Sequence, residues 1–267
     1  MRWMSDDHKA FQREGHALMR GLASRHQIET WRPVIEGVVA EERNDRQGRI
    51  DDYSKLFTQV TNVWRLSDAA REIVFTSRFA AAAAALLGVG GVRLYHDQAL
   101  FKQPGAGRTP WHQDRYYWPL DAAATVTMWL ALVDIDEQMG LMRFASGSQR
   151  ARDLGDLAIS DETDRRLDAL IAERRWPVWH SPALRAGDAT FHAGGTLHSA
   201  GANQSDRTRE VLTVIYYATG TRAAPPANDN QRVDLEVFLP GVRPGDEAAS
   251  ELNPILWRSG CDSPSSS

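Results

Sequence analysis

The hydrophobic pattern of the chain changes near Gly91, and this change limits the folds that the chain can adopt. Before it, residues 66–88 favour two short helices, because Ser67 and Asp68 can cap the first and an alanine run favours the second. Beyond it, alternating or β-branched segments favour strands over residues 92–102, 125–133, 188–191 and 209–218. Helices followed by many strands predict an α+β fold around an antiparallel sheet.

The first 45 residues also predict helix. Apolar residues recur at helical spacing across residues 5–45, as in Phe11, Leu18, Met19 and Leu22. A second helical stretch is predicted over residues 31–42, with Thr30 as its candidate N-cap. We expect these helices to pack on the sheet, and a further helix over residues 161–175 to lie at the surface because it carries charges of both signs.

No internal repeat and no Pro/Gly/Ser-rich linker divides the 267 residues. We therefore expect a single domain over residues 1–258, which is an ordinary size for one β-rich domain. Its helical part would cover about 1–90 and its β core about 91–240. The small, polar residues 259–267 predict a disordered tail.

Charge, cysteine content and the lack of long apolar segments argue against a nucleic-acid partner, a disulfide and a membrane span. The net charge is −4, and basic residues are mixed with acidic ones, so we expect no nucleic-acid surface. A single cysteine, Cys261, allows no intramolecular disulfide and suits a reducing compartment. The first 22 residues lack the apolar segment of a secretory signal, and the longest apolar run, 79–89, is too short to cross a bilayer. These features predict a cytoplasmic protein without a membrane partner.

The pattern His112-x-Asp114 carries the first chemical signal. On a strand, residues two apart point to one face, so an imidazole and a carboxylate would project together as metal ligands. His198, just before the strand 209–218, can complete a set of two histidines and one carboxylate. That set leaves open positions on the metal and is typical of non-haem Fe(II) oxygenases. His192, on the preceding strand, is the alternative distal ligand.

Arg209 begins the strand 209–218 and follows His198 closely. A buried guanidinium is costly unless it is paired, and a dicarboxylate would pair it through two hydrogen bonds. Arg207 is the alternative, although it lies among adjacent charges that are typical of an exposed loop.

Several motifs occur in a particular order. They are Phe-Lys-Gln-Pro-Gly at 101–105, Trp-His-Gln-Asp at 111–114, a strand with Trp129, Gly-Leu-Met-Arg-Phe-Ala-Ser-Gly-Ser at 140–148, Gly-Asp at 187–188, and His198 with Arg209. Together they resemble the phytanoyl-CoA dioxygenase family over about residues 92–220. The resemblance implies a double-stranded β-helix (jelly-roll, cupin-like) core with packed N-terminal helices. It also implies Fe(II) held by His112, Asp114 and His198.

The same resemblance implies 2-oxoglutarate as co-substrate, with Arg209 binding its distal carboxylate and Trp129 lining its pocket. Thr127 has the parity of Trp129 on its strand and would line the pocket too. Relatives often carry a small hydroxyl residue where this chain has Ala200, so one hydrogen bond to 2-oxoglutarate would be lost or come from Ser199 or Thr196.

The activity implied is that of an oxidoreductase, a dioxygenase that uses Fe(II), 2-oxoglutarate and O2 and releases succinate and CO2. The chain shows no cationic patch for a coenzyme A tail, so we expect a small or medium metabolite as substrate, within biosynthesis. Hydroxylation, ring closure and desaturation are all compatible with the family. Asp114 argues against a halogenase, which needs a small residue in place of the carboxylate ligand.

Strand parity predicts the residues that meet the substrate. Alternation over 92–102 places five side chains on one face, namely Leu94, His96, Gln98, Leu100 and Lys102, and of these we expect His96 and Gln98 to contact substrate. If the parity of His112 and Asp114 persists, Tyr116 and Trp118 also face the metal and Tyr117 faces away.

Two other functions are compatible with the ligand set. A zinc-dependent hydrolase can use two histidines and one aspartate, but it would not need Arg209. A non-catalytic metal-binding or ligand-binding module on the same fold would consume no O2. Succinate formation separates both from an oxygenase.

Overall fold

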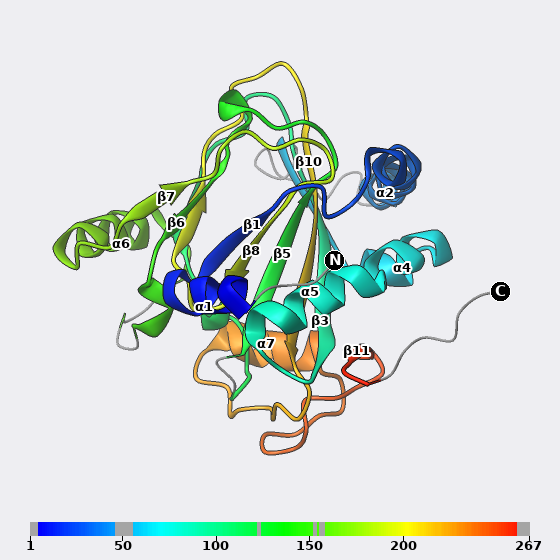
Figure 1. Cartoon of the computed structure of the whole chain (residues 1–267), viewed down its shortest axis with the longest axis vertical. Coiled ribbons are helices and arrows are strands. Elements are labelled where there is room, and N and C mark those ends of the chain that lie inside the picture. Colours follow the sequence, from blue (N-terminus) through cyan, green and yellow to red (C-terminus); the bar gives the residue numbers. More distant parts are fainter. Residues whose placement is uncertain (1–4, 46–55, 122–123, 152–153, 155–157, 261–267) are drawn as a thin grey trace.

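The computed structural model describes residues 5–45, 56–121, 124–151, 154 and 158–260, and it contains two antiparallel sheets (Figure 1). The larger sheet has the order β1 (His16–Met19), β8 (Ala189–Ala193), β5 (Thr125–Ala131), β10 (Arg209–Ala218), β3 (Gly91–Lys102) and β11 (Ile255–Arg258), and β2 (Phe57–Thr61) also pairs with β3. The smaller sheet has the order β4 (Thr109–His112), β9 (His198–Ala200), β6 (Met142–Ala145) and β7 (Val178–His180). This is the predicted α+β, jelly-roll arrangement.

The central strands of the larger sheet are buried on both faces. Along β5, Met128 and Leu130 pack in one hydrophobic cluster with the helices, whereas Trp129 and Ala131 pack in a second cluster with the smaller sheet. This alternation follows from the two-residue period of a strand. One face of the sheet therefore carries the helical layer, and the other face closes the interior of the jelly roll.

The helices flank the two sheets and one end of the strands (Figure 1). α4 (Asp68–Val74) and α5 (Ser77–Leu87) form as predicted, and the Ser67 hydroxyl caps α4 by accepting from the Ala70 N–H at 3.4 Å. The small alanines of α5 are buried and let the helix lie close to the larger sheet. α6 (Asp161–Glu173) also forms as predicted and contacts β4 of the smaller sheet.

The prediction of helix throughout residues 5–45 is wrong in its middle. α1 (Ser5–Glu14) ends at Gly15, which has a φ of 82°, and the next four residues form β1. There His16 pairs with His192 of β8, so tertiary pairing overrides the local helical spacing.

α2 (Arg25–Asp45) starts earlier than predicted, and Thr30 lies inside it. The Ser24 hydroxyl accepts from the Gln27 N–H at 3.2 Å, and the Gln27 side chain accepts from the Ser24 N–H at 2.9 Å. This reciprocal capping box, visible in the sequence as Ser-x-x-Gln, sets the start of the helix.

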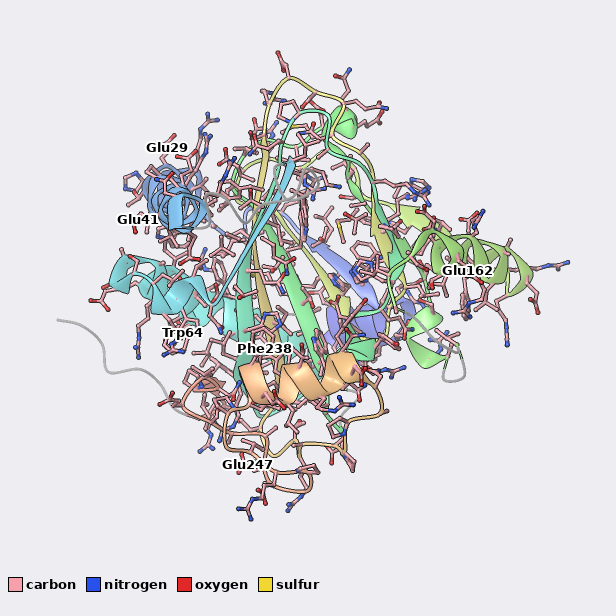
Figure 2. The ribbon with its side chains drawn as sticks, turned by 180° about the vertical axis from the view of Figure 1, so that it is seen from behind. Glu29, Glu41, Trp64, Glu162, Phe238 and Glu247 are labelled. Atoms are coloured by element: carbon pink, nitrogen blue, oxygen red, sulfur yellow. The ribbon has the colours of Figure 1, made fainter. Side chains whose placement is uncertain are left out.

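Besides β1, five strands come from segments for which no strand was predicted, namely β2, β6, β7, β9 and β11. Of the predicted disordered tail, only Ser259 and Gly260 belong to the described part of the chain, and residues 261–267 lie outside it. None of the helices in the described residues has the length and apolar character needed to cross a membrane. α7 (Asp229–Phe238) lies across one end of the strands (Figure 2).

Two backbone segments meet closely where the two sheets join. Gly140 has a φ of 80°, and a β-carbon placed on it would overlap the carbonyl oxygen of Gly201. The same glycine presents its own carbonyl to the buried guanidinium of Arg209 at 2.6 Å. Glycine is therefore needed at position 140 both for its conformation and for the space it leaves.

We expect Gly140→Ala to lower the free energy of unfolding by about 2–5 kcal/mol, because it adds steric overlap to an unfavourable φ. Gly105→Ala is the matched control, since Gly105 has a φ of 79° and open space around it. That control should lose only about 1–2 kcal/mol. Chemical denaturation measures both values, and equal losses would show that the contact with Gly201 is unimportant.

Candidate metal centre

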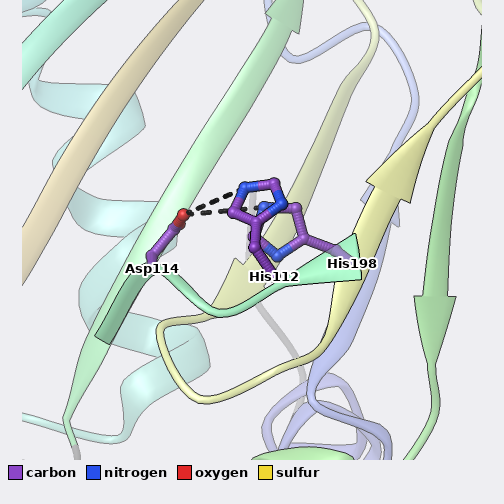
Figure 3. A group of neighbouring side chains, drawn as sticks. All are labelled: His112, Asp114 and His198. Atoms are coloured by element: carbon purple, nitrogen blue, oxygen red, sulfur yellow. Dashed lines mark ion pairs between the residues drawn. The ribbon is translucent and has the colours of Figure 1, made fainter. Parts of the chain in front are cut away.

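Strand pairing brings His112, Asp114 and His198 together (Figure 3). β4 pairs with β9 so that His112, the last residue of one, lies opposite His198, the first of the other. Asp114 begins the 3-10 helix η2 (Asp114–Tyr116) directly after β4. One ligand atom from each of the three residues lies within 4.8 Å of the others, so the group could hold a metal ion.

Both imidazoles are fixed by backbone carbonyls. His112 donates from Nδ1 to the Pro110 carbonyl at 2.8 Å, and His198 donates from Nδ1 to the Thr196 carbonyl at 3.0 Å. A carbonyl only accepts, so the proton of each neutral ring lies on Nδ1 and the lone pair on Nε2. The Nε2 atoms lie 3.8 Å and 3.5 Å from Oδ1 of Asp114, so two free lone pairs and one carboxylate oxygen converge.

The other oxygen of Asp114 is engaged by protein. Oδ2 accepts hydrogen bonds from the Thr127 hydroxyl at 2.7 Å and from His192 Nε2 at 3.0 Å. These contacts orient the carboxylate and leave Oδ1 facing the two histidines. His192, the alternative distal ligand, thus lies beside the group with its Nε2 directed at Asp114, and Thr127 contacts Asp114 as well.

The electrostatics prepare these groups for a cation. Burial lowers the pKa of His112 and lowers that of His198 further, so both imidazoles are neutral near pH 7. Burial opposes ionisation of Asp114 too, yet the neighbouring imidazoles of His198 and His192 hold its pKa below the usual value. Neutral imidazole and ionised carboxylate are the forms that bind metals.

A cavity of about 530 Å³ encloses the three residues. Along β10 its wall runs from Arg209 through Thr213 to Ile215, beside the aromatic side chains of Trp118 and Phe238. A larger cavity of about 840 Å³ lies elsewhere, next to Arg20 and Asp188, and it contains none of the three candidate ligands.

Arg209 lies in this cavity and Arg207 does not. The Arg209 side chain is buried, and its guanidinium carbon lies 5.2 Å from the centre of the Trp129 ring. Its Nε has no hydrogen-bond partner among the described residues. Burial lowers its pKa to about 10, so it stays charged at neutral pH, and no carboxylate of the described residues pairs with it. Arg207 is exposed and pairs with Asp136 at 3.0 Å. An anionic ligand at Arg209 would supply the missing partner.

Lys102 is a second buried cation that the sequence interpretation did not single out for the site. It lies opposite Arg209 in the pairing of β3 with β10. Its Nζ donates to the Thr109 hydroxyl at 3.2 Å and to the Gly201 carbonyl at 2.9 Å. Burial and then the charge of Arg209 lower its pKa to about 7, so it can lose its charge at this end of the jelly roll. The alternation of β3, which places Lys102 on the same face as His96 and Gln98, is the sequence feature that indicates this position.

Ala200 lines the cavity, as does Ser199, whose hydroxyl accepts from Arg143 Nε at 3.1 Å. The Thr196 hydroxyl is buried outside the cavity lining and donates to the Gly15 carbonyl at 2.7 Å. Of the two residues considered as substitutes for a hydroxyl at position 200, only Ser199 is therefore placed to reach a ligand.

The prediction that Tyr116 faces the cavity is wrong. β4 ends at His112 and the chain turns into η2, so the two-residue alternation of a strand does not continue. Tyr117 and Trp118 line the cavity, whereas Tyr116 packs against the cluster that contains Trp111.

His96 and Gln98 both lie in the cavity wall, and their contact with a substrate stays a prediction. Leu94 packs on the opposite face of the sheet, contrary to the predicted alternation. The cause is a β-bulge: the pairing of β3 with β10 shifts so that Tyr95 and His96 together oppose Ile215.

Comparisons with known proteins agree with this geometry. The family described as phytanoyl-CoA dioxygenase matches residues 11–211. Among curated proteins, none matches the sequence significantly. A solved non-haem α-ketoglutarate-dependent carbocyclase, SnoK from nogalamycin biosynthesis, is 25% identical with a TM-score of 0.78, over 95% of this chain and 96% of that one.

The epimerase SnoN, solved with Fe3+, α-ketoglutarate and nogalamycin RO, is 26% identical with a TM-score of 0.74, over 94% of this chain and 98% of that one. EctD from S. alaskensis, solved with 2-oxoglutarate and 5-hydroxyectoine, shares the fold at 17% identity and a TM-score of 0.69, over 84% of this chain and 79% of that one. The family match covers most of the sequence, and it includes the candidate ligands and Arg209. The chain belongs to the phytanoyl-CoA dioxygenase family of Fe(II)- and 2-oxoglutarate-dependent oxygenases.

Proposed function

We propose that the enzyme oxidises a small or medium metabolite at an iron held by His112 Nε2, His198 Nε2 and Asp114 Oδ1. The observation that carries this proposal is the convergence of these three atoms while every other polar atom of the same side chains is engaged by protein. A ligand set of two imidazoles and one carboxylate suits Fe(II) and leaves coordination positions open. When bound, the iron with 2-oxoglutarate and O2 supplies the oxidising chemistry, with release of succinate and CO2.

Arg209 would bind the distal carboxylate of 2-oxoglutarate. Its Nη1 is fixed on the Gly140 carbonyl and its plane lies near Trp129, while Nε lacks a partner in a buried position. A carboxylate there would accept charge-assisted hydrogen bonds and would compensate a charge that is otherwise costly to bury. Trp129 would form one wall of the co-substrate subsite, and Thr127 would act through its hydrogen bond to Asp114.

The unpaired guanidinium of Arg209 also separates this proposal from its alternatives. A zinc-dependent hydrolase has no use for a buried cation in the cavity of its metal, and it would form no succinate. The neighbouring structures include a carbocyclase and an epimerase, so ring closure and epimerisation stand beside hydroxylation as outcomes for this chain. We also propose a cytoplasmic location without nucleic-acid or membrane partners, which the single cysteine and mixed surface charge support.

The ligand set can be tested by alanine substitution. His112→Ala, Asp114→Ala and His198→Ala should each lower succinate formation by at least about 100-fold, because each removes one donor from the metal. Iron retained after anaerobic loading and gel filtration should fall as well. His180→Ala, at an exposed position of β7, is the control and should behave as wild type. Full activity in His198→Ala together with loss in His192→Ala would show that the distal ligand is His192.

The role of Arg209 can be tested against its neighbour in sequence. Arg209→Ala should raise the KM for 2-oxoglutarate by an amount corresponding to about 2–5 kcal/mol, because the carboxylate loses a buried partner. Arg207→Ala removes an equal charge from the surface and should change the KM little. Steady-state succinate formation gives both values, and equal KM values for wild type and Arg209→Ala would contradict the assignment.

A further inference from the structure

The part of the cavity beyond the metal centre has an aromatic wall. The β-bulge of β3 turns both Tyr95 and His96 toward this side of the sheet. The His96 ring stacks on Phe238 with centroids 4.2 Å apart, and the Tyr95 ring meets Trp118 edge-on at 5.6 Å. Burial lowers the pKa of His96 to about 4, so this wall is uncharged at neutral pH. The stacked rings of His96 and Phe238 and the edge-on rings of Tyr95 and Trp118 form an aromatic surface against which a ring system can pack.

α7 closes this part of the cavity and contributes one carboxylate to it. Figure 2 shows α7, which ends at the labelled Phe238, across the ends of the strands. Asp234 of this helix lines the cavity, and its Oδ2 accepts from the Tyr95 hydroxyl at 2.9 Å. No lysine or arginine of the described part of the chain pairs with Asp234, and burial raises its pKa to about 7. The carboxyl group is therefore held in place by Tyr95, but it has no cationic partner among the described residues.

The charged side chains of the cavity lining indicate which ligand each of them can bind. Three of its side chains, within the described residues, are carboxylates or guanidinium groups, namely Asp114, Arg209 and Asp234. Asp114 would be used by the metal, and Arg209 would be used by the co-substrate carboxylate. Asp234 is left facing the space that remains for the primary substrate.

We propose that Asp234 binds a protonated amine of the primary substrate, whose flat, mainly apolar ring system packs against the wall formed by His96, Trp118 and Phe238. This inference rests on the proposed function, since it assigns the rest of the cavity to iron and 2-oxoglutarate. An ammonium group compensates the buried carboxylate through a charge-assisted hydrogen bond. The neighbouring aromatic faces favour a cation as well. A negatively charged substrate would be repelled at the same position.

The test uses two probes with the same ring, 1-naphthylmethylamine and 1-naphthalenemethanol, which differ in carrying an ammonium or a hydroxyl group. Calorimetry would measure their binding to the full chain loaded with Fe(II) and 2-oxoglutarate without O2, at a pH above the pKa of Asp234. Asp234→Asn removes the charge but keeps an acceptor for the Tyr95 hydroxyl. Glu236→Gln removes an exposed carboxylate from the same helix and is the matched control.

Wild type and Glu236→Gln should bind the amine at least ~10-fold more tightly than the alcohol, and Asp234→Asn should lose this preference while binding the alcohol as before. Equal binding of the two probes by wild type, or a preference that survives in Asp234→Asn, would overturn the proposal. If Glu236→Gln also lost the preference for the amine, the preference would come from the overall negative charge of the helix. That result would overturn the proposal as well. Binding of 2-oxoglutarate is measured separately. If wild type failed to bind 2-oxoglutarate, that result would contradict the proposed function, whereas the amine preference alone tests the role of Asp234.

Discussion

The pairing of β4 with β9 is the constraint on which the site depends. It places His112 opposite His198 across the smaller sheet, and the turn into η2 brings Asp114 against both. Each of these side chains has one donor atom free because its other polar atom is bonded to protein. The jelly roll therefore fixes the geometry of the donor atoms before any metal binds, which limits the reorganisation that binding requires.

The interior of the jelly roll is divided by charge. Arg209 and Lys102 lie side by side in paired strands at one end, and no carboxylate of the described residues pairs with either of these buried groups. Asp234 stands at the other end, among aromatic rings. The metal ligands lie in the same cavity. An anionic co-substrate and a cationic substrate would thus be separated by electrostatics as well as by shape.

The family, the jelly roll and the proposed site could be predicted from the sequence to different extents. The order of motifs around His112 and His198 was enough for the family and for the fold, because their spacing reflects the strands that bring them together. Strand parity failed twice, at the β-bulge beside His96 and at the 3-10 turn after His112. Both depend on tertiary pairing, which local alternation cannot reveal. Asp234 was missed because nothing local distinguishes it from the other acids of an amphipathic helix.

A crystal structure of the chain loaded with Fe(II) and 2-oxoglutarate under anaerobic conditions would show directly which residues bind the iron and the co-substrate. We expect iron bound by His112 Nε2, His198 Nε2 and Asp114 Oδ1, with the distal carboxylate of 2-oxoglutarate on Arg209 and the Asp114 Oδ2 contacts unchanged. Iron bound through His192 in place of His198, or 2-oxoglutarate bound without contact to Arg209, would contradict it.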